Sequence, residues 1–440
     1  MKQVKESLYI QNIHVEELFG VFNYAIPSDD VEASVSNLLV LYGDNGAGKT
    51  TIIKILFYLL SAHDNKGHKS ALANIKFKKF IVKLSNGESI IAERPTSTLG
   101  SYTVTIKIPK KKSIQNVCQA KFENGEYVIR DSVLDDMFDH IRHMNLSLHF
   151  ISDDRKIENT YSLYNISKIP RHILSQMEHP NNINKSFLLN DAILEAAIKE
   201  VEEWFRFKAF EGASQGQESL NSIYFDVVEK LLDQPEVSNS DTLLKNKEEI
   251  LISLKNLQEK NKSFMKYKLT QDFNLGRFIT IITKSSDQGI VSIQNIINPF
   301  IDSIEQKLNA LNVTKNLIDV FITILNQFYT GKTVEFDIKN GLTVRSDYLD
   351  KSILNPNMLS SGEKQLLLLF CTVITSRNHA SIFIIDEPEL SLNIKWQRIL
   401  IKSLLACSEG SSIQFIFASH SIELLSQYKS QVSKLNHIVK

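Results

Sequence analysis

The sequence predicts an α/β fold with a parallel sheet, and three observations support this prediction. Residues 38–42 form a short apolar run, which is followed by a glycine-rich turn and by apolar residues at helical spacing. Two further apolar runs, 381–386 and 415–419, lie near the other end of the chain, and each ends in polar or charged residues. Asn-Gly pairs between β-rich flanks indicate antiparallel hairpins at 86–87, 124–125 and 340–341.

The glycine-rich turn is the first element with a chemical meaning. A strand before it and a helix after it predict a phosphate-binding loop. The glycines let successive backbone N–H groups face one anion, and the helix adds the positive end of its dipole. Lys49 is expected to reach the β- and γ-phosphates, and the Thr50 hydroxyl is expected to bind Mg²⁺. The predicted nucleoside triphosphate site consists of Gly43, Asn45, Gly46, Ala47, Gly48, Lys49, Thr50 and Thr51.

Four further motifs follow one another near the other end of the chain. They are Leu359–Gln365 at the start of a helical pattern, a strand ending in Asp386 and Glu387, the segment Leu390–Asn393, and a strand ending in His420. Each motif alone is a weak signal, because serine-glycine pairs commonly cap helices and a histidine after a strand is usually a loop residue. In this order they resemble the signature motif, the Walker B strand, the D-loop and the switch histidine of ABC-type ATPases.

The resemblance implies an ABC-type P-loop ATPase head with an antiparallel β lobe and a helical insertion domain. It implies that Asp386 holds Mg²⁺ through a water, together with Thr50, and that Glu387 polarises the attacking water. His420 is then expected beside the γ-phosphate of ATP, where it senses the phosphate and orients the water. Phosphoryl transfer depends on positioning and charge neutralisation, so Lys49 and Mg²⁺ are expected to carry most of the catalysis.

The signature motif also implies a site shared between subunits. By the same resemblance, Ser360 and Gly362 are expected to contact the γ-phosphate bound to a second subunit. The signature serine caps a helix, and the backbone N–H groups of a first helical turn form an anion site. The expected active unit is therefore at least a head-to-tail homodimer with ATP between the subunits.

The motifs depart from the usual ABC pattern at several positions. Ser361 and Glu363 stand where transporters usually carry glycine and glutamine, which is similar to the RecF, SMC and OLD groups. Asn393 ends the D-loop where many relatives have histidine or aspartate. No glutamine is assigned to the Q-loop, although the segment Leu148–Arg155 lies at about the right place.

Three regions are predicted along the chain. Residues 1–155 form the N-terminal ATPase lobe, which carries the P-loop and the antiparallel hairpins. Residues 156–330 form a helical insertion domain. Residues 331–440 form the C-terminal ATPase lobe, which carries the signature, Walker B, D-loop and switch histidine.

The insertion is predicted to be compact. Its leucines keep helical spacing only through about 243–265, which is too short for the long coiled coil of SMC-like proteins. Polar linkers are expected at Ala213–Gln217 and Gln234–Ser240. It either docks partners or sister subunits, or it is a purely structural cap.

Bulk properties favour a cytoplasmic protein. The chain has 440 residues with 50 basic and 50 acidic side chains, so its zero net charge gives no global attraction to nucleic acid or membrane. Three cysteines, Cys118, Cys371 and Cys407, lie at no metal or disulfide spacing, which suits a reducing compartment. The first residues resemble no signal peptide, and the longest apolar run, around Leu366–Ile374, is far shorter than a membrane span.

One aromatic segment has two interpretations. Aromatic and basic residues alternate through 204–210, as they do on surfaces that bind single-stranded nucleic acid. The same helical pattern has an apolar face, however, and this face favours packing in a core. The face consists of Leu194, Ile198, Val201, Trp204 and Phe205.

Histidines and lysines outside the motifs are also read as structural. His140, His143 and His149 lack a recognised metal-ligand pattern, so a metal site is the minor alternative. Lys110–Lys112 are expected in a solvated loop, with a contact to a phosphate backbone as the minor alternative.

The last motifs are most similar to stand-alone ATPases of bacterial anti-phage systems, first the PtuA family of Septu systems and next the AriA family of PARIS systems. Only 20 residues follow His420, so the Toprim nuclease domain that OLD-family nucleases carry there is not expected. The resemblance implies a homo-oligomeric ATPase that controls a separately encoded nuclease of HNH or Toprim type, with DNA as a further candidate partner and no membrane. Two alternatives stay open: a RecF-like DNA-repair ATPase, and a nucleotide-bound scaffold with little turnover.

Overall fold

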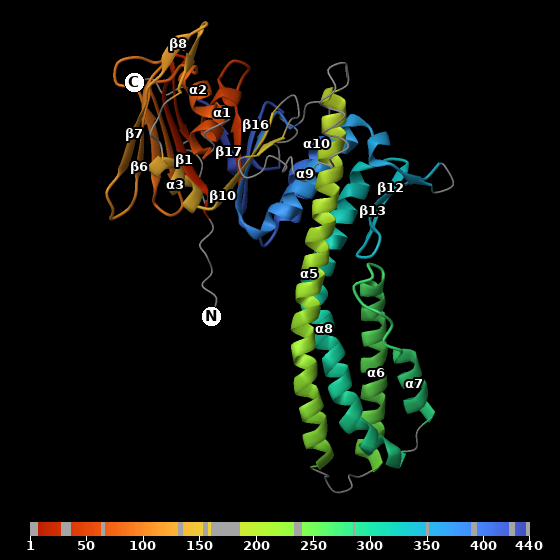
Figure 1. Ribbon diagram of the computed structural model, residues 1–440. Coiled ribbons are helices and arrows are strands. Elements are labelled where there is room, and N and C mark those ends of the chain that lie inside the picture. Colours follow the sequence, from red (N-terminus) through yellow and green to blue (C-terminus); the bar gives the residue numbers. More distant parts are fainter. Residues whose placement is uncertain are drawn as a thin grey trace. The chain divides into compact units, whose positions relative to one another are not determined.

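The computed structural model describes residues 8–27, 37–62, 67–130, 135–152, 157–159, 185–232, 240–284, 287–348, 352–388, 394–421 and 427–436. The chain divides into two compact units, which are described separately (Figure 1). Unit 1 comprises Met1–Ile193 and Thr372–Lys440, and unit 2 comprises Leu194–Cys371. The three regions predicted from the sequence are a finer division and stay a prediction.

A six-stranded sheet in unit 1 contains the three apolar runs that the sequence analysis singled out. Its order is β11-β10-β15-β16-β3-β17, and all neighbouring pairs except β10–β11 are parallel. The three central strands are almost wholly buried, as expected of parallel strands covered on both faces. The strands are β3 (Leu38–Tyr42), β10 (Leu146–Ile151), β11 (Ile157–Asn159), β15 (Ala380–Asp386), β16 (Ile413–Ser419) and β17 (Val432–Lys434).

A second six-stranded sheet in unit 1 is antiparallel, with the order β2-β1-β4-β5-β6-β7. Its strands are β1 (Ile10–Leu18), β2 (Phe22–Ile26), β4 (Lys79–Leu84), β5 (Ser89–Glu93), β6 (Tyr102–Lys107) and β7 (Ile114–Cys118). Two predicted Asn-Gly hairpins are confirmed: one joins β4 to β5 in this sheet, and the other joins β8 (Lys121–Glu123) to β9 (Glu126–Val128) in a separate two-stranded sheet. Both turn glycines, Gly87 and Gly125, have positive φ.

One hydrophobic core joins the two sheets of unit 1. It contains residues of both sheets together with Ile52, Leu56 and Phe57 of α1, none of which is exposed to solvent. The helices of unit 1 are α1 (Lys49–Leu60), α2 (His68–Ala73), α3 (Asp135–His143) and α10 (Ile394–Ser408), with short 3₁₀ turns at Ser376–Asn378 and Lys429–Gln431. The predicted α/β fold, with a parallel sheet and an antiparallel lobe, is therefore confirmed.

Unit 2 is mainly helical. It contains most of α5 (Lys185–Leu232), α6 (Ser240–Met265), α7 (Leu275–Lys284) and α8 (Asp287–Phe328). A core cluster joins α6, α7 and α8. At about 1.5 Å per residue, the 42-residue α8 is roughly 60 Å long. These helices are longer than those expected of the compact insertion that the sequence predicted.

The predicted linker at Ala213–Gln217 is wrong, because this segment lies inside α5. Gly212, the residue directly before this segment, has a packing reason to be glycine. A Cβ atom added to Gly212 would lie 3.0 Å from the carbonyl oxygen of Ala310 and 3.0 Å from the Leu311 side chain, both on α8. Gly212 is therefore glycine because α5 and α8 approach closely at this point, and it does not mark the end of a helix. The second predicted linker, 234–240, lies almost wholly outside the described residues.

Four residues of the apolar face predicted for 194–205 are buried, with Leu194, Ile198, Val201 and Phe205 each at most 8 % exposed, and the fifth, Trp204, is partly buried. In the part of the chain that is described, one helical segment, Ile297–Phe328, is long and apolar enough to cross a membrane by length and composition. Half of its most apolar window is buried inside the protein, as in the core helix of a globular unit.

A three-stranded antiparallel sheet in unit 2 leads into the helix that carries the signature motif. Its strands are β12 (Lys332–Asp337), β13 (Gly341–Ser346) and β14 (Ile353–Leu354). The predicted hairpin at Asn340-Gly341 joins β12 to β13 and is confirmed. A 3₁₀ turn (Pro356–Met358) then precedes α9 (Ser361–Thr375), which starts in unit 2 and ends in unit 1.

His149 is a buried neutral histidine in the parallel sheet. Its ring lies on β10, stacks on Phe383 of β15 at 4.3 Å, and its Nε2 is 3.2 Å from the Ser376 hydroxyl. Burial lowers the pKa of His149 to about 3. The unfolded chain therefore binds a proton near pH 6.5 that the folded chain does not bind until about pH 3.

This difference predicts that acidification below pH 6.5 destabilises unit 1 through His149, by about 2 kcal/mol at pH 5. His149→Phe keeps an aromatic ring against Phe383 but does not titrate, so its unfolding free energy should fall less between pH 7.5 and pH 5. Urea unfolding at both pH values measures the difference. The matched control is His143→Gln, because His143 is exposed, and it should retain the pH dependence of the natural protein. Equal pH dependence in His149→Phe and the natural protein would contradict the assignment.

Candidate functional site

The glycine-rich turn curls between β3 and α1. Gly46 and Gly48 have φ values of 86° and 87°, a left-handed conformation that glycine adopts without strain. The N–H of Ala47 donates to the Asp44 carbonyl at 3.2 Å, and the N–H of Ile52 donates to the Gly48 carbonyl at 2.9 Å, which starts the helix. Successive amides therefore precede the positive end of a 12-residue helix, as a phosphate-binding loop requires.

The antiparallel lobe holds this loop from one side. A Cβ atom added to Gly48 would lie 2.7 Å from Cδ2 of Leu18 and 3.2 Å from the Phe19 ring. The Tyr24 hydroxyl donates to the Ala47 carbonyl at 3.0 Å. Gly48 is thus required twice, by its backbone conformation and by the close approach of the β1–β2 turn.

Lys49 lies at the first position of α1 with its side chain folded over the loop. Its Nζ donates to the carbonyl oxygens of Gly43 and Asp44 at 2.8 and 3.3 Å, and it lies 3.8 Å from Oε1 of Glu387. The residue is 5 % exposed. Its ammonium group therefore lies within the loop that is expected to hold the phosphates.

Thr50 and Asp386 meet although 336 positions separate them in the sequence. The Thr50 hydroxyl donates to Oδ1 of Asp386 at 3.0 Å, and Asp386 is 2 % exposed. A hydroxyl and a carboxylate side by side are hard oxygen ligands of the type that Mg²⁺ prefers. Together with the phosphate loop, this donor pair fits a magnesium nucleotide: Thr50 and Asp386 would hold the metal ion.

Glu387 follows directly at the end of β15. Its N–H donates to the Ala418 carbonyl of β16 at 2.8 Å, and its φ of 44° is unusual for a residue other than glycine. Oε2 of Glu387 lies 2.6 Å from Nδ1 of His420, which follows β16. The carboxylate side chain is 14 % exposed and the histidine is 50 % exposed, so the pair is accessible from solvent.

The structure thus brings Lys49, Thr50, Asp386, Glu387 and His420 together within unit 1, at the carboxyl ends of three adjacent parallel strands. Of the other predicted nucleotide contacts, Asn45 and Gly46 are exposed, whereas Gly43, Ala47 and Thr51 are partly buried. The predicted D-loop, 390–393, lies outside the described residues, as do the last residues of the Q-loop segment, 153–155.

Ser360 and Gly362 belong to unit 2, where they form the start of α9. Ser360 and Ser361 are exposed, whereas the side chain of Glu363 is buried behind them. The Lys364 N–H donates to the Ser360 carbonyl at 2.9 Å, which is the first hydrogen bond of the helix. The first turn is therefore accessible to a ligand from solvent.

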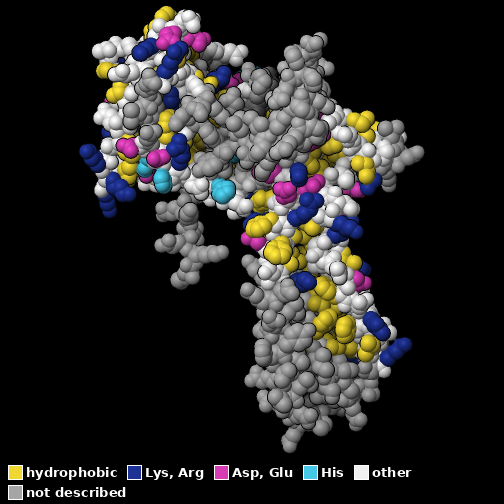
Figure 2. Space-filling view, viewed as in Figure 1, with side chains coloured by type: hydrophobic (Ala, Val, Ile, Leu, Met, Phe, Trp, Pro, Cys, Tyr) yellow, Lys and Arg dark blue, Asp and Glu magenta, His cyan; other side chains and the backbone are white. Residues whose placement is uncertain are grey.

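The minor alternatives of the sequence analysis have ordinary contacts. His140 Nε2 lies 2.9 Å from Glu88, and His143 Nδ1 lies 2.6 Å from the Asp139 carbonyl. Lys110–Lys112 are exposed in the turn between β6 and β7. On the face shown in Figure 2, basic and acidic side chains are interspersed, in keeping with the zero net charge of the chain.

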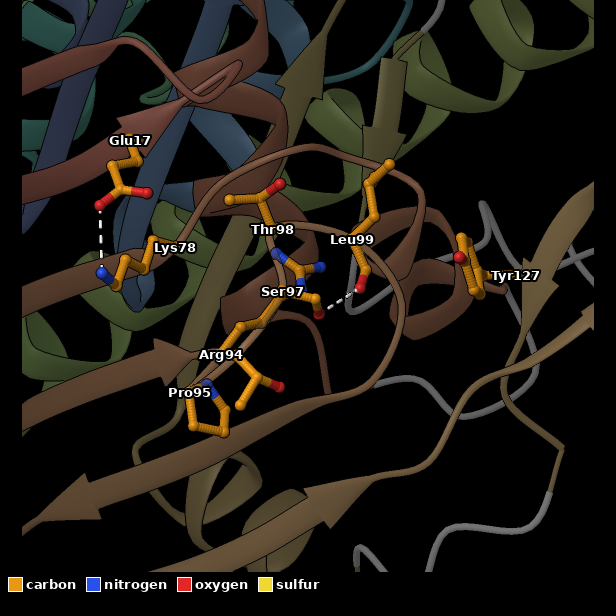
Figure 3. Close-up of a pocket in the computed structure, with 9 residues that line it drawn as sticks. Glu17, Lys78, Arg94, Pro95, Ser97, Thr98, Leu99 and Tyr127 are labelled. Atoms are coloured by element: carbon orange, nitrogen blue, oxygen red, sulfur yellow. Dashed lines mark hydrogen bonds and ion pairs between the residues drawn. The ribbon is translucent and has the colours of Figure 1, made fainter.

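Sequence reasoning missed a surface hollow of about 410 Å³ in unit 1 (Figure 3). One side carries the ion pair between Lys78 and Glu17, whose atoms lie 3.1 Å apart. Behind it the buried Arg94 donates to the carbonyl oxygens of Leu72 and Phe77, and burial lowers its pKa to about 10. The lining residues are Glu17, Lys78, Arg94, Pro95, Thr96, Ser97, Thr98, Leu99 and Tyr127. Six of them are consecutive in the loop after β5, and Glu17, Lys78 and Tyr127 join them only through the tertiary fold.

The fold and this site are those of a P-loop ATPase, in which two carboxylates and a histidine lie beside the phosphate loop. Residues 38–426 match the family described as "AAA domain, putative AbiEii toxin, Type IV TA system", and the chain belongs to this family. Comparison with curated proteins gives no match.

The solved structures that resemble the chain include the following three. The Smc head domain of Pyrococcus furiosus, with an extended coiled coil and bound to the C-terminal domain of ScpA, is 15 % identical; the match covers 95 % of this chain and 91 % of that chain, with a TM-score of 0.36. An SmcHead bound to the C-winged helix domain of ScpA is 12 % identical, with coverage of 95 % and 91 % and a TM-score of 0.34. The recombination mediator protein RecF-ATPrS of the RecFOR pathway is 12 % identical, with coverage of 95 % and 94 % and a TM-score of 0.29.

The close approach at Gly48 yields a testable prediction. Gly48→Ala should lower the unfolding free energy for two reasons: alanine is strained in the left-handed conformation, and its Cβ would clash with the buried Leu18. Gly67→Ala is the control, because Gly67 also has a positive φ, +67°, but open space around its Cβ, so this variant adds only the backbone strain. The difference in unfolding free energy should be about 1–3 kcal/mol, the usual cost of overpacking. Urea unfolding of the two variants measures this difference, and equal costs would contradict the packing described here.

Proposed function

We propose that this chain is the ATP-binding and ATP-hydrolysing sensor or scaffold subunit of a bacterial anti-phage defence complex, and that it controls a separately encoded nuclease. The observation that most supports the ATP-hydrolysing part of this proposal is the contact between Glu387 and both Lys49 and His420. A carboxylate between a phosphate-binding lysine and a histidine is arranged for water activation beside a γ-phosphate. The resemblance of the motifs to Septu and PARIS ATPases supplies the biological context.

The proposed roles follow from the positions of the side chains. Lys49 would exchange the two loop carbonyls for the β- and γ-phosphates, since an ammonium can reorient its three donors. Mg²⁺, when held by Thr50 and Asp386, would neutralise phosphate charge. Glu387 would accept the proton of the attacking water, and His420 would hold that water in line with the γ-phosphate.

The remaining ligands would come from a second copy of the chain. Ser360 and Gly362 lie at the start of α9, where Ser360 is exposed and Gly362 is partly buried, and N–H groups at such a turn attract an anion. We therefore propose a cytoplasmic homo-oligomer, at least a head-to-tail dimer, in which these residues contact the γ-phosphate held by the partner's P-loop. The long helices of unit 2 are the proposed docking surface for the nuclease, because an ATPase cycle alone does not require them.

Two alternative functions are each favoured by a particular feature or result. A RecF-like DNA-repair ATPase is supported by the exposed Lys110–Lys112 turn, and salt-dependent binding of DNA by the isolated chain would favour it. A nucleotide-bound scaffold is compatible with the same site geometry, and ATP-stabilised oligomers with negligible turnover would favour it.

Substitutions in the site should separate ATP binding from hydrolysis. Lys49→Ala should abolish ATP binding, because it removes the phosphate-binding ammonium. Glu387→Gln should keep binding but slow hydrolysis by about 10²–10⁴-fold, the usual loss when a positioned base is removed. Nucleotide titration and phosphate release measure the two effects. Glu93→Gln, which alters a surface ion pair with Lys79 in the same unit, is the control and should change neither. Equal loss of nucleotide affinity in Lys49→Ala and Glu387→Gln would refute the role of Glu387.

The defence role predicts a division of labour between two chains. Purified alone, the protein should hydrolyse ATP slowly and should cleave neither DNA nor RNA with Mg²⁺ or Mn²⁺. Co-expressed with the product of its neighbouring gene, it should form a stable complex, and protection against phage should need both chains and an intact Lys49. Plaque assays and nuclease assays check this. Robust cleavage by the single purified chain, lost on mutating residues outside the ATP site, would overturn the proposal.

A further inference from the structure

The signature serine is held by a residue one helical turn ahead of it. Oε2 of Glu363 accepts the Ser360 N–H at 2.8 Å and the Ser360 hydroxyl at 2.9 Å. In return, the Glu363 N–H lies 3.4 Å from the Ser360 hydroxyl oxygen. This reciprocal arrangement is a capping box. One carboxylate oxygen therefore accepts both donors of Ser360 and holds the serine in place. To contact ATP in the shared site, the Ser360 hydroxyl would turn its hydrogen from Glu363 to the γ-phosphate.

That carboxylate is buried and paired. The side chain of Glu363 is 7 % exposed, and Nζ of Lys332, from β12, lies 2.8 and 2.9 Å from its two oxygens. The hydroxyl of the buried Tyr329 donates to the backbone carbonyl of Glu363 at 3.1 Å. Burial opposes ionisation, but the hydrogen bonds from Lys332 and Ser360 lower the pKa of Glu363, so it is a carboxylate at neutral pH.

A negative charge at this place conflicts with an anionic ligand. The N–H groups and dipole of the first turn attract a phosphate, whereas a carboxylate in the same turn repels it. The repulsion is strong because a partly desolvated pair of charges is poorly screened. Lys332 cancels the charge of Glu363 and leaves its Oε2 bonded to Ser360. The ion pair thus lets Glu363 cap the helix start through Ser360 without placing an uncompensated negative charge beside the γ-phosphate.

We propose that Lys332 is a positioning residue for ATP hydrolysis: it neutralises Glu363, so that Glu363 orients Ser360 without repelling the γ-phosphate. The inference rests on the proposed function, since Ser360 acts on ATP only in the shared site. Lys332 belongs to none of the sequence motifs and lies 31 positions before Glu363. Its role follows from the way the β12–β13 hairpin is placed beside the start of α9.

Charge rescue tests this role in the full-length protein. Lys332→Gln leaves Glu363 buried without its countercharge, so ATP turnover should fall about tenfold or more. Adding Glu363→Gln restores a neutral pair, and glutamine also serves in a capping box, so turnover of the double variant should return to within about threefold of the natural protein. ATP affinity of the P-loop should stay unchanged in both variants. The matched control is Lys268→Gln, which breaks an ion pair with Asp337 at the end of β12 and should leave turnover intact.

A second readout does not depend on ATP. Amide hydrogen exchange in the first turn of α9 should speed up in Lys332→Gln, return toward the natural rate in the double variant, and stay unchanged in Lys268→Gln. Normal turnover and normal exchange in Lys332→Gln, or a double variant as impaired as the single one, would overturn the inference. If the natural protein bound ATP but never hydrolysed it, the proposed function would fail, while the exchange rates would still decide whether Lys332 positions Ser360.

Discussion

The parallel pairing of β16 with β3 on one side and β15 on the other is the constraint on which the site depends. In this register Ala418 is opposite both Leu41 and Asp386, so the three strands end at the same level. Residues distant in sequence therefore meet at one edge of the sheet. A slip of one residue in any strand would turn every side chain to the opposite face and separate the carboxylates from the phosphate loop.

Packing then makes this edge rigid. The helix after the phosphate loop is buried along one side in a core shared by both sheets of unit 1, and Leu18 of the antiparallel lobe closes against Gly48. The left-handed conformation of Glu387 costs about 1–2 kcal/mol and is held by the hydrogen bond of its N–H to Ala418. Strain at this residue aims its carboxylate toward Lys49 and His420, away from the regular path of β15.

The local features were predictable because each has a local cause. Strand runs, Asn-Gly turns and the phosphate loop depend on neighbouring residues, so the sequence predicts them with their residues. Lys332 and Arg94 act through partners that only tertiary folding brings near, and no spacing rule indicates them. The linker predicted at 213–217 is wrong because a polar composition alone does not end a helix, and the contact of Gly212 with α8, just before it, is one that its own neighbours do not reveal. The roles of Ser360 and Gly362 stay predictions, because they involve a second subunit.

The length of α8 gives unit 2 a mechanical property. The helix ends at Phe328, four positions before Lys332, so its carboxyl end adjoins the strand that carries this lysine. A rod about 60 Å long converts a tilt of about 5° at one end into a displacement of about 5 Å at the other. A load on the distant tip therefore acts with a long lever arm on the hairpin beside the signature helix.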